Sequence, residues 1–468
     1  MVFSSFVFLL AFLPIVLLLY YLCPARLRNL VLLVFSLVFY AWGEPVYVLI
    51  MLFSIVFDYA NGRLIEHFKN KNCPGKAKAA LIVDLCGNLA ILGFFKYTDF
   101  VIGSINSITG AGLSLLHIAL PIGISFYTFQ TMSYTIDVYR GEVAAQKNIL
   151  TFATYVTLFP QLIAGPIVQY KTVEKELMHR KVTLEDFSEG AFRFSVGLAK
   201  KVLLANQIGS LWNSISQLNH MSVATAWLGA IAYSFQIYFD FSGYSDMAIG
   251  LGKMFGFDFM ENFNYPYIST SIREFWRRWH ISLSTWFREY LYIPLGGNRK
   301  GQVRTYINLL IVFFATGLWH GAGATFIIWG LYHGLFLVVE RMGLGKLLEK
   351  NCFRGLNHIY TTLVVVVGWV FFRADTLADA KGILHQMFTW ENGIYPASLF
   401  VNRKVIFLAV LGVLLSGIVQ SICPKLREHL YEKEVTKTVD IVIMAVLLFL
   451  CTMYLVSSTY NPFIYFRF

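Results

Sequence analysis

Two histidines lie beside tryptophans in a sequence where ionisable side chains are scarce. His320 sits in the run from Ala315 to Ala322, between two apolar stretches, and His280 ends a charged, aromatic segment that starts at Arg273. An ionisable group at membrane depth is costly and usually serves function. Because histidine exchanges protons near neutral pH, these positions predict general acid–base chemistry inside a membrane, with His320 as the base.

Each histidine also has a purely structural explanation. His320 fits a core histidine bonded to a backbone carbonyl, and His280 fits an interfacial side chain that faces lipid headgroups. Gly317 and Gly321 favour function at His320, because small residues allow a substrate or a helix to approach closely. His333 follows 13 residues later, a spacing that does not place it on the same helical face. We interpret it as a supporting polar residue.

Two carboxylates, Asp240 and Asp246, lie within the apolar segment 223–255. A lone carboxylate is expensive there. The sequence leaves several explanations open: pairing with arginines of segment 273–288, orientation of a histidine, or binding of a proton or cation. Structural pairing and a functional role carry equal weight.

Basic residues gather just before the span that carries His320. They suit bidentate contact with phosphate, and the candidates for binding donor phosphates are Arg273, Arg277, Arg278, Arg288 and Arg299. Contact with lipid headgroups explains the same charges.

At the C-terminal end, Tyr465 follows Pro462 in an aromatic cluster. The cluster fits an interfacial aromatic belt. Alternatively, the tail folds back and presents the tyrosine hydroxyl.

Several chemistries lack their motifs. The sequence contains no HExxH, no GxSxG and no Walker loop, so zinc hydrolysis, an elbow serine and an NTP-driven pump are unsupported. The six cysteines are scattered without a CxxC pair, which argues against a structural zinc or a disulfide framework. We expect no metal and no bound cofactor. The basic residues do not interleave with a recognition module, so we expect no nucleic-acid partner.

Composition defines the class of protein. The 468 residues are 57% hydrophobic and 14% charged, against about 25% charged for a soluble domain. This predicts an all-α polytopic membrane protein with about 11–13 membrane segments, in contact with lipid and forming one domain over residues 1–468. The net charge of +11 fits positively charged cytoplasmic loops. Residues 2–22 lack a preceding positive charge, so we expect a retained first span that starts outside.

Some segments are interrupted. Pro121 breaks the apolar stretch 115–136, and Pro160 and Pro166 break 149–169, so both are expected to be kinked or re-entrant. Segment 259–302 carries no clean span. Its aromatic and basic spacing predicts an amphipathic interfacial helix followed by a turn at 292–299.

These blocks resemble the membrane-bound O-acyltransferase superfamily, and most closely its bacterial alginate O-acetyltransferase branch. The resemblance rests on Gly317-Leu318-Trp319-His320-Gly321, on the REFWRRWH run that ends at His280, and on the FDFSGYSD run from Phe239 to Asp246. It extends along the whole chain. It implies a helical bundle around a central funnel, in the inner membrane of a bacterium.

The resemblance also implies a reaction. His320 corresponds to the catalytic histidine and His280 to a second functional position, while Tyr465 matches a tyrosine proposed to carry the acyl group outward. The implied donor is acetyl-CoA. An extracytoplasmic partner of the SGNH esterase-like type and a polysaccharide acceptor (alginate-like, cellulose or peptidoglycan) are expected. We expect His280 to bind or polarise the thioester end.

Three alternatives remain at this stage. A D-alanyl transferase or a lysophospholipid acyltransferase of the same superfamily would share the histidines. A proton-coupled transporter would use Asp240, Asp246 and His320 as a relay, although no inverted repeat supports it.

Overall fold

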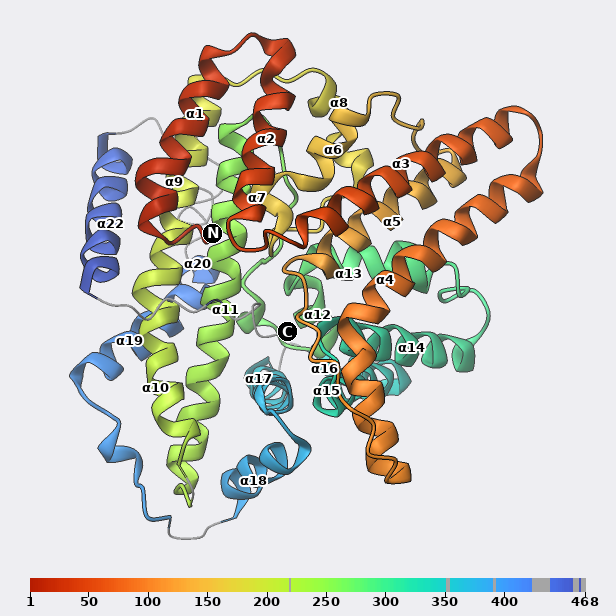
Figure 1. Ribbon diagram of the computed structural model, residues 1–468. Helices are drawn as coiled ribbons and strands as arrows, with labels where there is room; N and C mark the ends of the chain where they lie inside the picture. Colours follow the sequence, from red (N-terminus) through yellow and green to blue (C-terminus); the bar gives the residue numbers. More distant parts are fainter. Residues whose placement is uncertain (219, 351–353, 390–392, 423–437, 458–462, 464–468) are drawn as a thin grey trace. The chain divides into compact units, whose positions relative to one another are not determined.

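The computed structural model describes residues 1–468 except 219, 351–353, 390–392, 423–437, 458–462 and 464–468 (Figure 1). It is 77% helical. The described residues form no sheet, only an isolated bridge between Met221 and Tyr395. The all-α prediction is therefore confirmed. The chain divides into two compact units: unit 1 is Met1–Phe194 with Met247–Met260, and unit 2 is Ser195–Asp246 with Glu261–Phe468.

Unit 1 is built from the N-terminal helices. They are η1 (Val7–Phe12), α1 (Leu13–Leu22), α2 (Arg28–Ala41), α3 (Val48–Asn70), α4 (Pro74–Thr109), α5 (Ile124–Arg140), α6 (Ile149–Thr157), α7 (Phe159–Leu162), α8 (Tyr170–Met178) and most of α9 (Leu184–Ala199). Phenylalanine rings fill its core. Phe159 lies 5.3 Å from Phe12 and 5.6 Å from Phe39 between ring centroids. Such contacts join α7 to η1 and α2.

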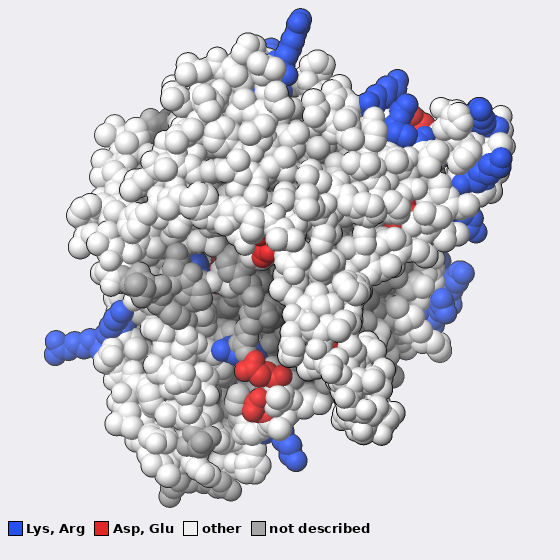
Figure 2. Space-filling model, viewed as in Figure 1, with Lys and Arg blue, Asp and Glu red and all other residues white. Residues whose placement is uncertain are grey.

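Helices α3 and α4 pair as a long hairpin in unit 1 (Figure 1). Both are long and apolar enough to cross a membrane. Figure 2 shows basic side chains gathered at the tip of this hairpin and a mainly uncharged stem. The tip contains Lys69, Lys71, Lys76 and Lys78. This separation of charge from apolar length is typical of a membrane hairpin with a cytoplasmic loop.

The two interrupted segments are indeed broken. Residues 112–121 carry no regular structure, and α5 begins only at Ile124. In the next segment, α6 ends at Thr157, and α7 starts with Pro160 in its first turn. Proline lacks the amide hydrogen that a continuous helix would use, which explains the break.

Unit 2 contains the remaining helices. They are η3 (Lys200–Ala205), α10 (Asn206–Ser216), α11 (Val223–Met254, whose end belongs to unit 1), α12 (Ile272–Arg278), α13 (Ile281–Phe287), η5 (Arg288–Tyr292), α14 (Gln302–His320), α15 (Ala324–Val339), η6 (Glu340–Leu344), α16 (Gly345–Leu348), α17 (Arg354–Arg373), α18 (Leu377–Phe388), α19 (Arg403–Val413), η9 (Leu414–Ile418), α20 (Val419–Ile422) and α22 (Thr438–Ser457). Among the described residues, three stretches of unit 2 are long and apolar enough to cross a membrane: Ala324–Leu348, Arg354–Arg373 and Thr438–Ser457.

The segment expected to hold an interfacial helix has a different role. It forms α12, which buries Phe275 and Trp276 and packs against α15 and α17. Phe275 lies 6.3 Å from Trp369 of α17 between ring centroids. The aromatic residues therefore face protein, and α12 is part of the core of unit 2. The predicted turn is present after Tyr292.

Candidate active site

His320 is the last residue of α14, and close packing of α14 against α15 fixes its position. A Cβ added at Gly317 would lie 2.4 Å from the Phe326 carbonyl oxygen, and one at Gly330 would lie 2.2 Å from that of Phe313. Only glycine permits this approach of two backbones. The helix stops at Gly321, which is extended, so the histidine stands at the end of a rigid hairpin.

Aromatic rings surround His320, whose side chain is 4% exposed. Trp329 of α15 and Phe372 of α17 each lie 5.1 Å away between ring centroids. His280 follows at 6.3 Å. The two histidines predicted as catalytic are therefore brought together within unit 2, although 40 residues separate them in the sequence.

His280 lies between α12 and α13 in a left-handed backbone conformation, with φ +46°. Such a conformation is strained for a residue other than glycine, and strain of this kind concentrates at functional sites. Its ring Nδ1 is 3.1 Å from the Asn262 side-chain oxygen. Complete burial lowers the pKa of His280 to about 3, so the ring is neutral at pH 7. His280 lies outside the helices long and apolar enough to span a membrane.

His333 is completely buried on α15 and does not join this pair. Its ring packs 5.1 Å from Trp276 and 5.5 Å from Trp329 between centroids. Neither ring nitrogen has a hydrogen-bond partner among the described residues. Trp329 contacts both His320 and His333 and so links them.

The two carboxylates of α11 pair with lysines of η3. Lys201 Nζ is 2.5 Å from Asp240 Oδ1, and Lys200 Nζ is 2.6 Å from Asp246 Oδ2. Of the explanations that the sequence left open, the structure shows pairing, and the partners that it shows are lysines. Both lysines belong to the π-helical segment η3, Lys200–Ala205.

Three of the five arginines line a cavity of about 250 Å³. Arg273, Arg277 and Arg288 are exposed at this cavity, whose other walls are mostly apolar and include Trp276 and Phe313. Thr316, one helical turn before His320, also lines it. The cavity therefore combines basic groups with an apolar interior near the histidine pair.

The other two arginines lie elsewhere. Arg278 bonds to Glu274 at 2.9 Å and to the Asn264 carbonyl at 2.9 Å, so it braces α12. Arg299 is exposed in the turn before α14 and does not line the cavity. Neither residue is therefore placed to contact a molecule bound in the cavity lined by Arg273, Arg277 and Arg288.

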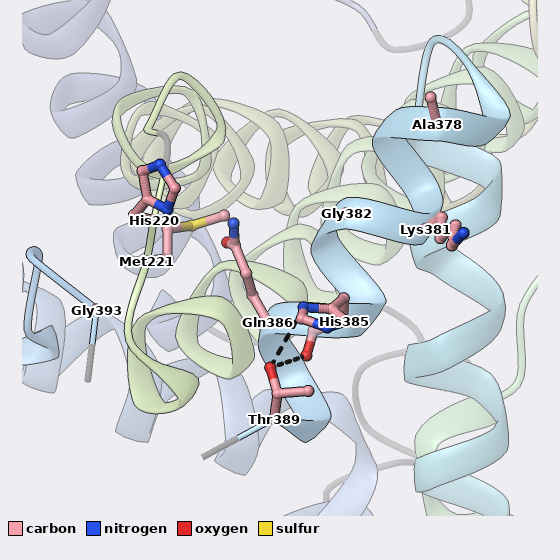
Figure 3. Close-up of a pocket in the computed structure, with 9 residues that line it drawn as sticks. All are labelled: His220, Met221, Ala378, Lys381, Gly382, His385, Gln386, Thr389 and Gly393. Carbon is pink, nitrogen blue, oxygen red and sulfur yellow. Dashed lines mark hydrogen bonds between the residues drawn. The ribbon is translucent and has the colours of Figure 1, made fainter. Parts of the chain in front are cut away.

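A larger cavity of about 460 Å³ lies beside α18 (Figure 3). Figure 3 shows His220 and Met221 on one side and Lys381, His385 and Thr389 on the other. None of its described lining residues is a predicted site residue. Size alone therefore does not identify the site.

Tyr465 lies outside the described residues, but Phe463 is described. Its ring stacks on Tyr244 of α11 with centroids 4.6 Å apart, and Lys201 Nζ lies 5.9 Å from its centroid. Phe463 therefore packs between Tyr244 of α11 and Lys201 of η3.

Sequence reasoning missed three supports of the site. Glu340 accepts hydrogen bonds from the backbone amides of Ile272 at 2.6 Å and Arg273 at 3.0 Å, which fixes the start of α12. Lys200 and Lys201 lie within an apolar stretch, and this pattern could have predicted that acidic side chains pair with them. Asn262 carried no such signal, because an asparagine in a loop is ordinary. Among the described residues, no cluster of three or more His, Cys, Asp or Glu could hold a metal.

The chain is similar to known acyltransferases. The model of the MBOAT, membrane-bound O-acyltransferase family, matches residues 141–378. The probable alginate O-acetylase AlgI of Pseudomonas aeruginosa is 50% identical over 84% of this chain and 76% of its own length. The corresponding protein of Azotobacter vinelandii is 47% identical over 90% and 84%. A peptidoglycan O-acetyltransferase of Helicobacter pylori is 35% identical over 100% and 98%.

The helical fold, with several helices long and apolar enough to cross a membrane, agrees with these comparisons. The chain belongs to the membrane-bound O-acyltransferase family. It is thus an enzyme of the acyltransferase class and a multi-pass membrane protein.

Proposed function

We propose that the protein moves an acetyl group from acetyl-CoA on the cytosolic side of a bacterial inner membrane toward an extracytoplasmic polysaccharide. Relatives named as alginate and peptidoglycan O-acetyltransferases support this acceptor class. An SGNH-type acetyltransferase is the proposed external partner. The observation that carries the proposal is the buried pair of His320 and His280, with ring centroids 6.3 Å apart.

The reaction is transfer of an acyl group between a thiol and a hydroxyl. His320 takes the proton of the acceptor hydroxyl, and the oxygen of that hydroxyl attacks the thioester carbonyl carbon. The carbon–sulfur bond breaks, the proton passes to the departing thiolate, and an O-acetyl ester forms. The proposed first acceptor is Tyr465, whose ester would carry the acetyl group outward.

The cavity with Arg273, Arg277 and Arg288 is the proposed donor site. A CoA-type donor has anionic phosphates at one end and a thin, mostly uncharged arm that ends in the thioester. Guanidinium groups at the exposed part of the cavity suit the phosphates, and the apolar walls suit the arm. A lysophospholipid has a similar polarity, so the donor must be tested directly.

The test incubates purified protein with radiolabelled acetyl-CoA and measures label on the chain and on added acceptors. Wild type is compared with His320→Ala and Tyr465→Phe, and with matched controls His385→Gln and Tyr454→Phe. We expect His320→Ala to lower transfer at least about 100-fold, the scale of lost general-base catalysis. Tyr465→Phe should abolish label on the chain.

Several outcomes contradict parts of the proposal. Absence of transfer by wild type would reject acetyl-CoA as donor. Chain labelling that survives Tyr465→Phe would reject the tyrosine relay. Labelling of lysophospholipid in place of soluble glycan acceptors would favour a lipid acyltransferase.

A further inference from the structure

Asn262 forms an unusually complete set of hydrogen bonds to the turn that carries His280. It is completely buried, and its backbone oxygen accepts from the Ile281 amide at 3.0 Å. Its side-chain oxygen accepts from the Ser282 amide at 3.2 Å and from the Ser282 hydroxyl at 2.9 Å. Its side-chain nitrogen donates to Ser245 Oγ at 3.1 Å. One asparagine thereby holds residues 280–282 to α11.

These contacts settle which end of the Asn262 amide faces the histidine. A backbone N–H can only donate, so the atom that meets the Ser282 amide must be the oxygen. The same oxygen is 3.1 Å from His280 Nδ1. Because a carboxamide oxygen only accepts, Nδ1 must carry the hydrogen of this bond.

The remaining ring nitrogen follows from this assignment. A neutral imidazole has one protonated nitrogen, so Nε2 of His280 carries a lone pair and no hydrogen. Nε2 is buried and has no hydrogen-bond partner among the described residues. The Phe241 ring packs edge-to-face against the His280 ring, with centroids 4.7 Å apart.

We propose that Asn262 is a positioning residue that locks His280 in the Nδ1–H tautomer, so that Nε2 accepts a hydrogen bond from an X–H group of a substrate. This inference rests on the proposed function, because it assumes that His280 meets the substrates. In this role His280 does not polarise the thioester carbonyl, because a ring nitrogen without hydrogen cannot donate to a carbonyl oxygen. The X–H group is either the acceptor hydroxyl or the amide N–H next to the thioester in a pantetheine arm.

The tautomer is tested without any activity. Protein with ¹⁵N-labelled histidine is examined by solid-state NMR, and the His280 signals are found by difference from His280→Gln. We expect a protonated Nδ1 and an unprotonated Nε2 at pH 7, and a mixture of tautomers in Asn262→Leu. A protonated Nε2 in wild type overturns the proposal, even if the enzyme proves inactive with acetyl-CoA.

Kinetics test the consequence for the reaction. Asn262→Leu keeps the size but removes the acceptor, and we expect kcat/KM to fall about 10- to 100-fold, the scale seen when outer partners of functional histidines are removed. Asn262→Asp restores an acceptor oxygen and adds a negative charge beside Nδ1–H. It should recover much of the rate and shift the acidic limb of the pH–rate profile to higher pH, because the carboxylate raises the pKa of the imidazole.

A structural role for Asn262 would give a different result. Both variants would then lose activity in proportion to lost folded protein, and the pH profile of the remaining activity would not move. That outcome overturns the proposal. Absence of activity in wild type would instead reject the proposed function, and the NMR experiment would still test the tautomer of His280.

Two thioesters distinguish the two sources of X–H. S-acetyl-N-acetylcysteamine offers an amide N–H near the thioester, and its N-methyl analogue does not. If His280 binds the donor arm, wild type prefers the first compound at least about 10-fold and Asn262→Leu loses the preference. If wild type shows no preference, His280 accepts from the acceptor hydroxyl, provided that Asn262→Asp shifts the pH profile. Failure of both readouts overturns the proposal.

Discussion

Both units bury carboxyl groups inside apolar helices, and the two units give them different partners. In unit 1, Asp58 and Asp84 are completely buried, and their oxygens accept from Asn88 Nδ2 and Thr135 Oγ1, each at 2.6 Å. Neither forms an ion pair with a described residue, and the donors to both carboxyl groups are neutral side chains.

In unit 2, each buried acid instead meets a lysine, as Asp240 does with Lys201. The comparison shows two solutions to one electrostatic problem. Unit 1 surrounds its buried acids with neutral amide and hydroxyl donors. Unit 2 places its buried acids in ion pairs with lysines, on the helix that also contacts Asn262 and Phe463. Substitutions in each unit test these two arrangements separately.

Breaking an ion pair in unit 2 should have the largest effect. Lys201→Met removes the lysine that pairs with the buried Asp240, and we expect a loss of about 3–5 kcal/mol in the free energy of unfolding. Equilibrium unfolding in dodecyl maltoside–SDS mixtures, followed by tryptophan fluorescence, measures it. The double variant Lys201→Met/Asp240→Leu removes both charges and should recover most of the loss. A single variant as stable as wild type would show that the pair carries no charge.

His280, which is neutral in the folded protein, should give the next largest effect, a dependence of stability on pH. Its folded pKa, about 3, lies below the ordinary value of 6.5, so the unfolded chain binds more protons between these values. Stability is therefore fully present above pH 6.5 and is lost as pH falls toward 3, with a slope of up to about 1.4 kcal/mol per pH unit. His280→Gln should flatten this part of the profile. An unchanged slope would mean that other groups control it.

Neutralising an acid in unit 1 should cost much less. In Asp84→Asn, the amide oxygen can still accept from Thr135, and no ion pair is lost among the described residues. We expect a change within about 1 kcal/mol in the same unfolding experiment at pH 7. Asp240→Asn in unit 2 is the matched comparison and should lose more, because it breaks the buried ion pair with Lys201. Equal losses at the two positions would remove the distinction between the units.

The sequence predicted part of this arrangement, for identifiable reasons. Scarce charge and long apolar runs predicted the helical membrane class, and the tryptophan–histidine blocks predicted two residues that the fold brings within 6.3 Å. It could not predict that Lys201 opposes Asp240, because pairing depends on how η3 and α11 face each other. It also could not predict Asn262, whose importance comes from a local turn and not from its residue type.

The third buried histidine of unit 2 gives the smallest expected effect. His333 is neither paired nor bonded to a described residue, and its surroundings are the rings of Trp276 and Trp329. His333→Leu keeps a similar volume and removes two polar atoms that lack partners there, so we expect stability within about 1 kcal/mol of wild type or slightly above it. Acetyl transfer should stay within about threefold, in contrast to His320→Ala. A loss of acetyl transfer of more than tenfold without unfolding would show that His333 takes part in the chemistry, although no described residue bonds to its ring nitrogens.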